Sequence, residues 1–196
     1  MLHHEISGNG KKPLVLLHGF MENTTIWDEM EAHLSKDFTL IKIDLPGHGK
    51  SKVYQEIHTV ELMAEKVKEV IDALKLEKIN LLGHSLGGYV SLAFAEKFPE
   101  ILESMTLFFS TTVADDEEKK QIRRRSIAVI DENFETFVKT SIPNLFSNNE
   151  KDILEGKIEL AKNIAKSTNK EGVKAAQLGM AERPDRTEIL ENLDAK

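Results

Sequence analysis

Short apolar runs alternate with helical patterns throughout the first 110 residues of the chain. A buried strand reads as a compact apolar run, whereas an amphipathic helix repeats its apolar residues every three or four positions. Such alternation predicts an α/β fold, with a mostly parallel sheet and helices on both of its faces. The runs lie at 14–17, 38–43, 78–82 and 105–109, the helical patterns at 24–34, 59–74 and 85–97, and a further run at 2–7 is compatible with a first strand.

From Asp115 to Leu193 the pattern is helical, and no run reads convincingly as a strand. Short helices that follow an α/β unit are typical of a lid. We therefore expect a core over 1–114, a helical lid over 115–182 and a return segment over 183–196. Four apolar groups support this, the first with Ile122, Val129 and Ile130 on one face, the second with Phe134, Phe137 and Val138, the third from Ile153 to Ala165 and the fourth from Val173 to Met180.

The composition excludes several classes of protein. The 196 residues include no cysteine, and 26 Lys and Arg against 33 Asp and Glu give a net charge of −7. A disulfide framework, an iron–sulfur cluster and a cysteine nucleophile are therefore excluded, and nucleic acid or an anionic membrane is disfavoured as a partner. No apolar stretch resembles a signal peptide or approaches the roughly 18 residues of a membrane span. We expect a cytoplasmic protein.

The motif Gly83-His84-Ser85-Leu86-Gly87-Gly88 lies between an apolar run and a helical pattern. A sharp strand-to-helix turn lifts a serine Oγ clear of its neighbours, and the glycines let other backbone segments approach closely. The start of the helix supplies free N–H groups and a positive dipole end, where negative charge on an oxygen would be stabilised. Ser85 is therefore the candidate catalytic nucleophile, with the N–H of Leu86 as a candidate oxyanion donor.

A second element, His18-Gly19-Phe20, follows the apolar run at 14–17. A loop at this place could bring the N–H of Phe20 toward Ser85. Together with Leu86, it would form an oxyanion hole with two donors. Losing one such donor typically costs about 2.7–4 kcal/mol of transition-state stabilisation.

These motifs resemble those of the α/β-hydrolase fold superfamily. Three elements occur in the family's order, L-V-L-L-H-G-F at 14–20, D-L-P-G-H-G-K-S at 44–51 and L-L-G-H-S-L-G-G at 81–88, and G-M-A-E-R-P-D-R-T at 179–187 looks like the end of the lid in small esterases and lactonases. The resemblance implies a serine hydrolase that forms an acyl-enzyme without a metal or cofactor. It implies that Ser85 attacks the substrate carbonyl, that Phe20 and Leu86 hold the oxyanion, and that the lid helices shape the substrate pocket.

One departure from the family pattern concerns the catalytic base. The family's triad runs Ser, then Asp or Glu, then His along the chain. None of the seven histidines follows Ser85. We therefore expect the chain to lack the last two strands of the fold, with the base and the acid, so that the segment 183–196 returns toward a missing core strand. We also expect slow turnover of substrate by this chain. The apolar run at 105–109 would then be an uncovered edge strand, which favours a homo-oligomer or a swapped dimer.

Several residues admit two interpretations. His18 could be a base but is better explained as a structural residue of its loop. His84 adjoins Ser85, yet adjacent side chains at a tight turn point in different directions, and His48 is a minor candidate for a substitute base. Asp115 and Asp116 could supply the acid, but the favoured interpretation is that they stabilise the start of a lid helix. The run Arg123-Arg124-Arg125 could bind an anion or form a solvated helix face.

Three functions remain open at this point. The favoured one is hydrolysis of small apolar esters or lactones through an acyl-serine. The alternative is a non-catalytic protein whose lidded pocket binds a small apolar ligand. A third option keeps the fold and changes the reaction to C–C bond hydrolysis, dehalogenation or acyl transfer. A phosphate-binding loop at 44–51 is disfavoured because Asp44 stands where that motif needs its first glycine.

Overall fold

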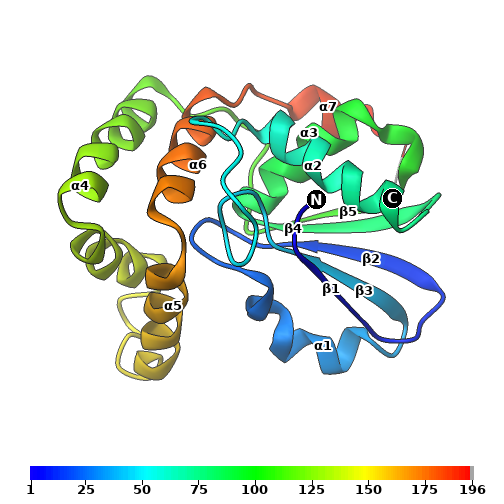
Figure 1. The fold of residues 1–196 in the computed structure, drawn as a ribbon, viewed down its shortest axis with the longest axis horizontal. Helices are drawn as coiled ribbons and strands as arrows, with labels where there is room; N and C mark the ends of the chain where they lie inside the picture. The colour runs from blue at the N-terminus through cyan, green and yellow to red at the C-terminus, as the bar shows by residue number, and fades with distance from the viewer. Residues whose placement is uncertain (195–196) are drawn as a thin grey trace.

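A five-stranded sheet forms the centre of the computed structural model, which describes residues 1–194 (Figure 1). The strand order is β1-β3-β2-β4-β5. Strand β1 runs antiparallel to β3, and all other neighbours are parallel, which confirms the predicted mostly parallel sheet. The strands are β1 (His4–Ser7), β2 (Lys12–Leu17), β3 (Phe38–Ile43), β4 (Ile79–His84) and β5 (Leu102–Phe108).

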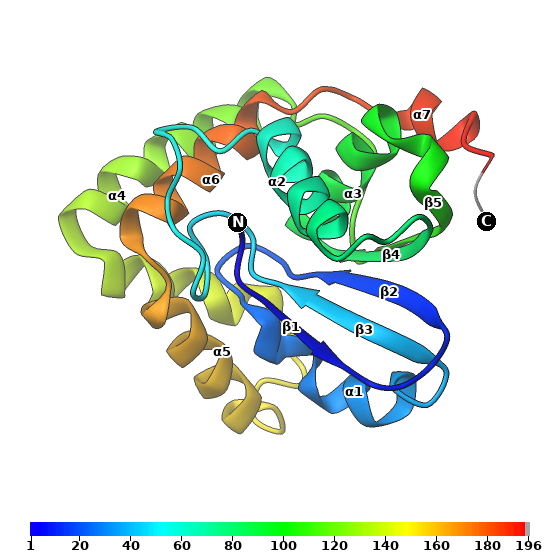
Figure 2. The same cartoon turned by 45° about the vertical axis from the view of Figure 1, so that its right-hand side comes forward.

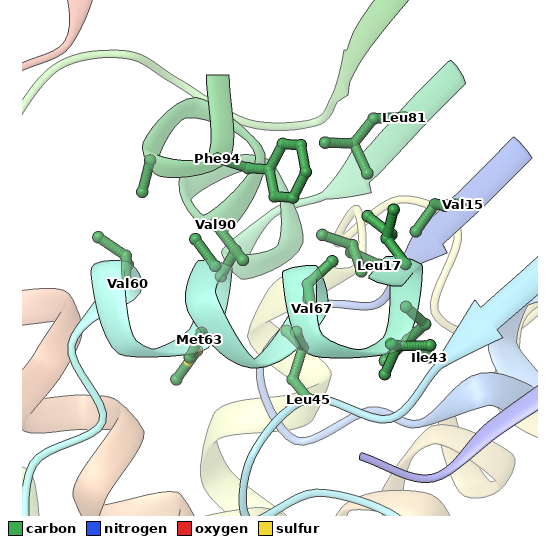
Figure 3. Packing of buried hydrophobic residues seen from close by; sticks show 14 of the residues in the cluster. Val15, Leu17, Ile43, Leu45, Val60, Met63, Val67, Leu81, Val90 and Phe94 are labelled. Atoms are coloured by element: carbon green, nitrogen blue, oxygen red, sulfur yellow. The ribbon is translucent and has the colours of Figure 1, made fainter. Parts of the chain in front are cut away.

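Helices cover both faces of the sheet, as the alternating pattern predicts (Figure 2). On one face α2 (Val60–Ala73) and α3 (Leu86–Lys97) pack on the sheet. The Thr59 hydroxyl caps α2 by accepting from the N–H of Leu62 at 3.1 Å, as its sequence position predicts. Figure 3 shows the apolar stripe of α2 in this core, among side chains of β2 and α3.

The opposite face carries the segment 24–34, and its form differs from the single helix expected there. It begins with a 3₁₀ turn, η1 (Thr24–Trp27), and continues as α1 (Asp28–Leu34). The side chain of Asn23 accepts from the N–H of Thr25 and starts the turn. Trp27 is buried against the sheet in a second core cluster with side chains of β2 and β3.

After β5 the chain is helical as far as the structure describes it, and the first two predicted helices follow one another across a kink, without a loop. The long helix α4 (Glu117–Ser141) bends at Asn133, whose φ of −155° and ψ of 91° are not helical. The Asn133 side chain accepts from the N–H of Thr136 at 2.9 Å and so restarts the helix after the bend. The other helical segments are η3 (Ile142–Leu145), α5 (Glu155–Ser167), α6 (Lys170–Glu182) and α7 (Thr187–Glu191).

The predicted apolar face with Ile122, Val129 and Ile130 is wrong in part. Ile130 is buried, whereas Ile122 is 57% and Val129 is 44% exposed. Helix α4 packs through Ile130, Phe137 and Val138 around Met21, which follows β2. The N–H of His58 donates to the carbonyl of Ala175 on α6. These contacts place the helices α4 to α6 beside the carboxyl ends of β2 and β3.

Strand β5 is an edge strand, since no strand of residues 1–194 pairs with its outer side. Phe108 at its end is 38% exposed, and Phe109 beyond it is 81% exposed.

Within residues 1–194, no helix is long and apolar enough to cross a membrane.

Residues 183–194 return beside α3 and contain α7, and the last two residues of the predicted return segment lie outside the described residues. Arg186 anchors this return. Its side chain is buried and donates to Glu96 of α3 at 2.8 and 2.9 Å and to Glu61 of α2 at 2.5 Å. Arg183 likewise pairs with Asp115 at 2.9 Å and lies over the ring of Tyr89.

We expect Arg186→Ala to lower the free energy of unfolding by about 1–3 kcal/mol, because charge-assisted hydrogen bonds to two helices are lost while both carboxylates can be rehydrated. Urea unfolding followed by circular dichroism measures this. Arg124→Ala, at an exposed arginine of α4, is the matched control and should change stability by less than about 0.5 kcal/mol. Equal stability of the Arg186 variant and the parent would contradict the anchoring role.

Candidate active site

Ser85 occupies a sharp turn between β4 and α3. Its φ of 48° and ψ of −111° lie in a region that residues other than glycine rarely adopt. Its N–H donates to the carbonyl of Phe108 at 3.0 Å, and its carbonyl accepts from Ser110 Oγ at 2.9 Å and from the N–H of Gly88 at 2.9 Å. The main chain is therefore held on both sides of the turn. The side chain is only half-buried, and no hydrogen bond within residues 1–194 engages its Oγ.

The turn depends on glycine because backbone segments touch there. A Cβ at Gly87 would lie 2.2 Å from the carbonyl oxygen of Leu17 at the end of β2, and one at Gly83 would lie 2.3 Å from the carbonyl oxygen of Gly87. At Gly88 it would lie 2.3 Å from Ser110 Oγ. These distances leave no space for a side chain, so the spacing of glycines around Ser85 has a direct steric cause.

The two candidate oxyanion donors lie on segments that meet at this turn. Leu86 is the first residue of α3, and Phe20 lies in the turn after β2. The end of β2 rests on the first turn of α3, since the carbonyls of Leu17 and His18 both approach Gly87. Within residues 1–194 neither the N–H of Phe20 nor that of Leu86 donates a hydrogen bond. Both donors therefore remain free to bind an anionic oxygen.

His18 holds the loop and is not placed as a base. It is fully buried, Nδ1 donates to the carbonyl of Gly19 at 2.7 Å, and Nε2 accepts from the N–H of Leu45 at 2.9 Å. Burial lowers the pKa of His18, although the hydrogen bond to Gly19 opposes this. A neutral ring with both nitrogens engaged ties the loop after β2 to the loop after β3.

His48 and His58 are buried in the same region. The Nδ1 of each ring donates to the carbonyl of Pro46, at 3.0 and 3.1 Å. Burial lowers the pKa of His48 to about 3, and burial also lowers the pKa of His58. The Nε2 of His48 has no hydrogen-bond partner within residues 1–194, and its ring lies 5.3 Å from the ring of His18. The substitute-base role considered for His48 therefore has no contact with Ser85 to support it.

His84 turns away from Ser85 toward a carboxylate. Its Nδ1 donates to Oε2 of Glu22 at 2.9 Å, and its ring lies 5.7 Å from the ring of Phe108. Sequence analysis does not single out Glu22, because nothing near it in the chain predicts contact with a residue 62 positions away. An acidic residue shortly after His-Gly was the available signal, and it is a weak one.

The remaining charged candidates have structural partners. Asp44 is buried and accepts from the N–H groups of Thr24 and Lys50 and from His3 Nδ1. The Asp116 carboxylate caps α4 by accepting from the N–H of Lys119 at 2.8 Å, as the favoured interpretation predicts.

Asp115 is paired with Arg123 and Arg183. Burial would raise the pKa of the Asp115 carboxyl, but the hydrogen bonds from these arginines outweigh it and lower that pKa. Of the arginine run, Arg124 and Arg125 are exposed. Within residues 1–194 no group of three or more His, Asp or Glu side chains is arranged to hold a metal ion.

The chain resembles known proteins of one family. The sequence profile described as alpha/beta hydrolase fold matches residues 12–154. A thermophilic esterase from Thermogutta terrifontis is 36% identical, with a TM-score of 0.93 over 99% of this chain and 72% of its own. The enol-lactonase from Burkholderia xenovorans LB400 is 21% identical, with a TM-score of 0.90 over 99% of this chain and 75% of its own, and shares the fold.

Curated relatives match over shorter stretches. A mouse protein described as serine hydrolase-like is 35% identical over 130 residues, which cover 63% of this chain and 42% of that protein. An uncharacterised protein of Mycobacterium bovis is 34% identical over 111 residues, which cover 57% of this chain. The chain spans only 32% of the length of that relative.

Proposed function

The chain belongs to the α/β-hydrolase fold family, and from that premise we propose that it is a hydrolase of small apolar carboxylic esters or lactones that acts through an acyl-Ser85 intermediate. One observation carries the proposal. The backbone of Ser85 is held in a strained conformation at the start of α3, while its Oγ is engaged by no other group within residues 1–194.

The proposed reaction has two steps. Ser85 Oγ attacks the carbonyl carbon and gives its proton to solvent water or hydroxide, and the carbonyl oxygen becomes an oxyanion that accepts hydrogen bonds from the N–H groups of Phe20 and Leu86. Collapse of this tetrahedral intermediate breaks the bond to the leaving oxygen, which takes a proton from water, so that the alcohol departs or the lactone ring opens and an ester remains on Ser85. Attack of water on that ester returns the free serine and releases the acid. The chain needs no metal or cofactor for these steps.

Turnover by this chain is proposed to be slow. No histidine nitrogen within residues 1–194 is hydrogen-bonded to Ser85 Oγ, so no imidazole is placed to take its proton. Removing one member of a serine triad costs on the order of 10⁴–10⁶ in rate, and the oxyanion donors account for part of what remains. Deacylation is slowed for the same reason. With an activated ester such as p-nitrophenyl acetate the acyl-enzyme should still accumulate, because p-nitrophenolate is a far better leaving group than the serine alkoxide that deacylation must expel.

We also propose that the segment 115–182 acts as a lid over the core of residues 1–114. Its helices α4 to α6 pack beside the carboxyl ends of β2 and β3, where the loop with Phe20 begins. Phe20 itself packs against both the main core and the cluster formed by α4 to α6. In this arrangement the helices would form the wall of the substrate pocket.

A panel of substrates tests the proposed class. We expect release of p-nitrophenolate from the acetate and butyrate esters above the buffer rate, slower release from long-chain esters, and none from p-nitroacetanilide, whose amide needs a proton donor for the leaving group. Ring opening of a small lactone is measured in parallel. The alternative is a non-catalytic, ligand-binding member of the family. It is supported by the absence, within residues 1–194, of a base that is hydrogen-bonded to Ser85 Oγ. It predicts that a small ester binds but is hydrolysed only at the buffer rate, and this result would contradict the hydrolase.

A further inference from the structure

One carboxylate oxygen joins the two segments of the candidate active site. Oε2 of Glu22 accepts from the N–H of Gly19 at 2.6 Å and from Nδ1 of His84 at 2.9 Å. Gly19 immediately precedes Phe20, and His84 immediately precedes Ser85. The loop with one candidate oxyanion donor is therefore tied to the turn with the nucleophile through a single atom.

The three groups are in direct contact. A Cβ added at Gly19 would lie 2.7 Å from Oε2 of Glu22 and 2.9 Å from Nδ1 of His84. Only glycine leaves the carboxylate room to approach the main chain here. Since the acceptor is charged, both hydrogen bonds are stronger and more directional than those of a neutral pair.

The turn from Gly19 to Glu22 is also closed by its own main chain. The N–H of Glu22 donates to the carbonyl of Gly19 at 3.3 Å, and Nδ1 of His18 donates to the same carbonyl. Met21 adopts a φ of 58°, and its buried side chain packs among residues of α4. Phe20 is thus fixed from both neighbours, while its own N–H has no acceptor within residues 1–194.

We propose that Glu22 is a positioning residue that holds the Phe20 N–H in place opposite Ser85, an inference that rests on the proposed hydrolase function. The carboxylate touches neither substrate nor Ser85 Oγ, and acts through Gly19 and His84. The side chains of His84 and Glu22 are 22% and 26% exposed, so water can replace their hydrogen bonds in a variant, and the role predicts a large effect on rate with a small effect on folding. It also predicts that an acceptor oxygen at position 22 is sufficient.

Three variants test this role. With p-nitrophenyl acetate, Glu22→Ala should lower kcat by on the order of 100-fold, because a donor displaced by about 1 Å no longer meets the oxyanion. Glu22→Gln keeps an acceptor oxygen and should stay within about threefold of the parent in kcat, and KM should change by less than about threefold in both. Glu31→Ala is the matched control, since Glu31 is a carboxylate of similar exposure that pairs with Lys42 away from the site. It should leave kcat unchanged, and its melting temperature is the reference for Glu22→Ala.

Amide NMR provides a readout that does not depend on turnover. Loss of the 2.6 Å hydrogen bond should shift the Gly19 N–H upfield, speed its hydrogen exchange and move the Phe20 amide resonance in Glu22→Ala, and not in Glu22→Gln. An unchanged kcat in Glu22→Ala, or a higher KM with the same kcat, would overturn the role. Should the parent show no hydrolysis dependent on Ser85, the proposed function fails, and the NMR result alone decides whether Glu22 holds the loop. Unchanged Gly19 and Phe20 amides in Glu22→Ala would then overturn that.

Discussion

Replacing Ser85 by alanine is expected to lower the initial release of p-nitrophenolate from p-nitrophenyl acetate by at least about 100-fold. The hydroxyl is held beside free N–H groups at the start of α3, so its attack needs little further ordering. Alanine keeps the backbone atoms and removes the nucleophile alone. The time course of p-nitrophenolate release, a burst of one equivalent followed by slower turnover, measures the effect, because acylation by this activated ester should precede deacylation.

Ser104→Ala is the matched control for this experiment. Ser104 is a half-buried serine on β5 that donates to Asn80 at 2.6 Å, near the end of the sheet opposite to Ser85. It should retain the full burst. A burst of equal size in the parent and the Ser85 variant would show that another group, such as a surface lysine, is acylated.

Mild acid should destabilise the fold because three buried histidines stay neutral in it. Burial lowers the pKa of His18, His48 and His58, and that of His48 falls to about 3. In the unfolded chain these rings titrate near a pKa of about 6.5. Below that pH the three rings bind protons in the unfolded state but not in the folded state. The stabilisation is therefore complete above about pH 6.5 and falls as the pH drops toward 3.

The expected slope from His48 is about 1.4 kcal/mol per pH unit, or about 2 kcal/mol between pH 6.5 and pH 5, and His18 and His58 add to it in the same direction. Urea unfolding at pH 7.5, 6 and 5 measures it. The carboxyl of Asp115, whose pKa is lowered by its arginines, contributes only at lower pH, since such a group loses its stabilisation below its unfolded pKa of about 3.8.

His48→Gln removes one titrating ring and should flatten the pH dependence by about 2 kcal/mol over this range, whatever it costs at neutral pH. His33→Gln, at an exposed histidine of α1, should leave the slope unchanged. The interpretation of His48 as a buried neutral ring is contradicted if both variants and the parent lose the same stability.

Much of the core follows from local patterns in the sequence. Strand β3 begins and ends at the predicted residues, and α2 lies within the predicted 59–74, because each pattern reflects burial on a sheet face. The packing of the helices after β5 is harder to predict from the sequence. Which face of α4 is buried depends on α6, more than 40 residues later, so Ile122 and Val129 are exposed despite their spacing.

The residues of the candidate site also differ in whether a local sequence motif reveals them. Ser85, Phe20 and Leu86 could be named because short motifs place them at the ends of strands. Glu22 could not, since its proposed role depends on its contact with the side chain of His84 on β4, 62 positions away. The structural role of His18 becomes definite only when the N–H of Leu45 is seen to donate to it. Long-range contacts of this kind leave no local signal in the sequence.

The central claim is that Ser85 Oγ becomes acylated. The direct measurement is to incubate the chain with p-nitrophenyl acetate, quench it in acid within the burst, and locate the acetyl group by mass spectrometry of its peptides. We predict one acetyl group per chain, on the hydroxyl of Ser85. An acetyl group found only on lysines, or an unmodified Ser85 after the burst, would contradict the claim.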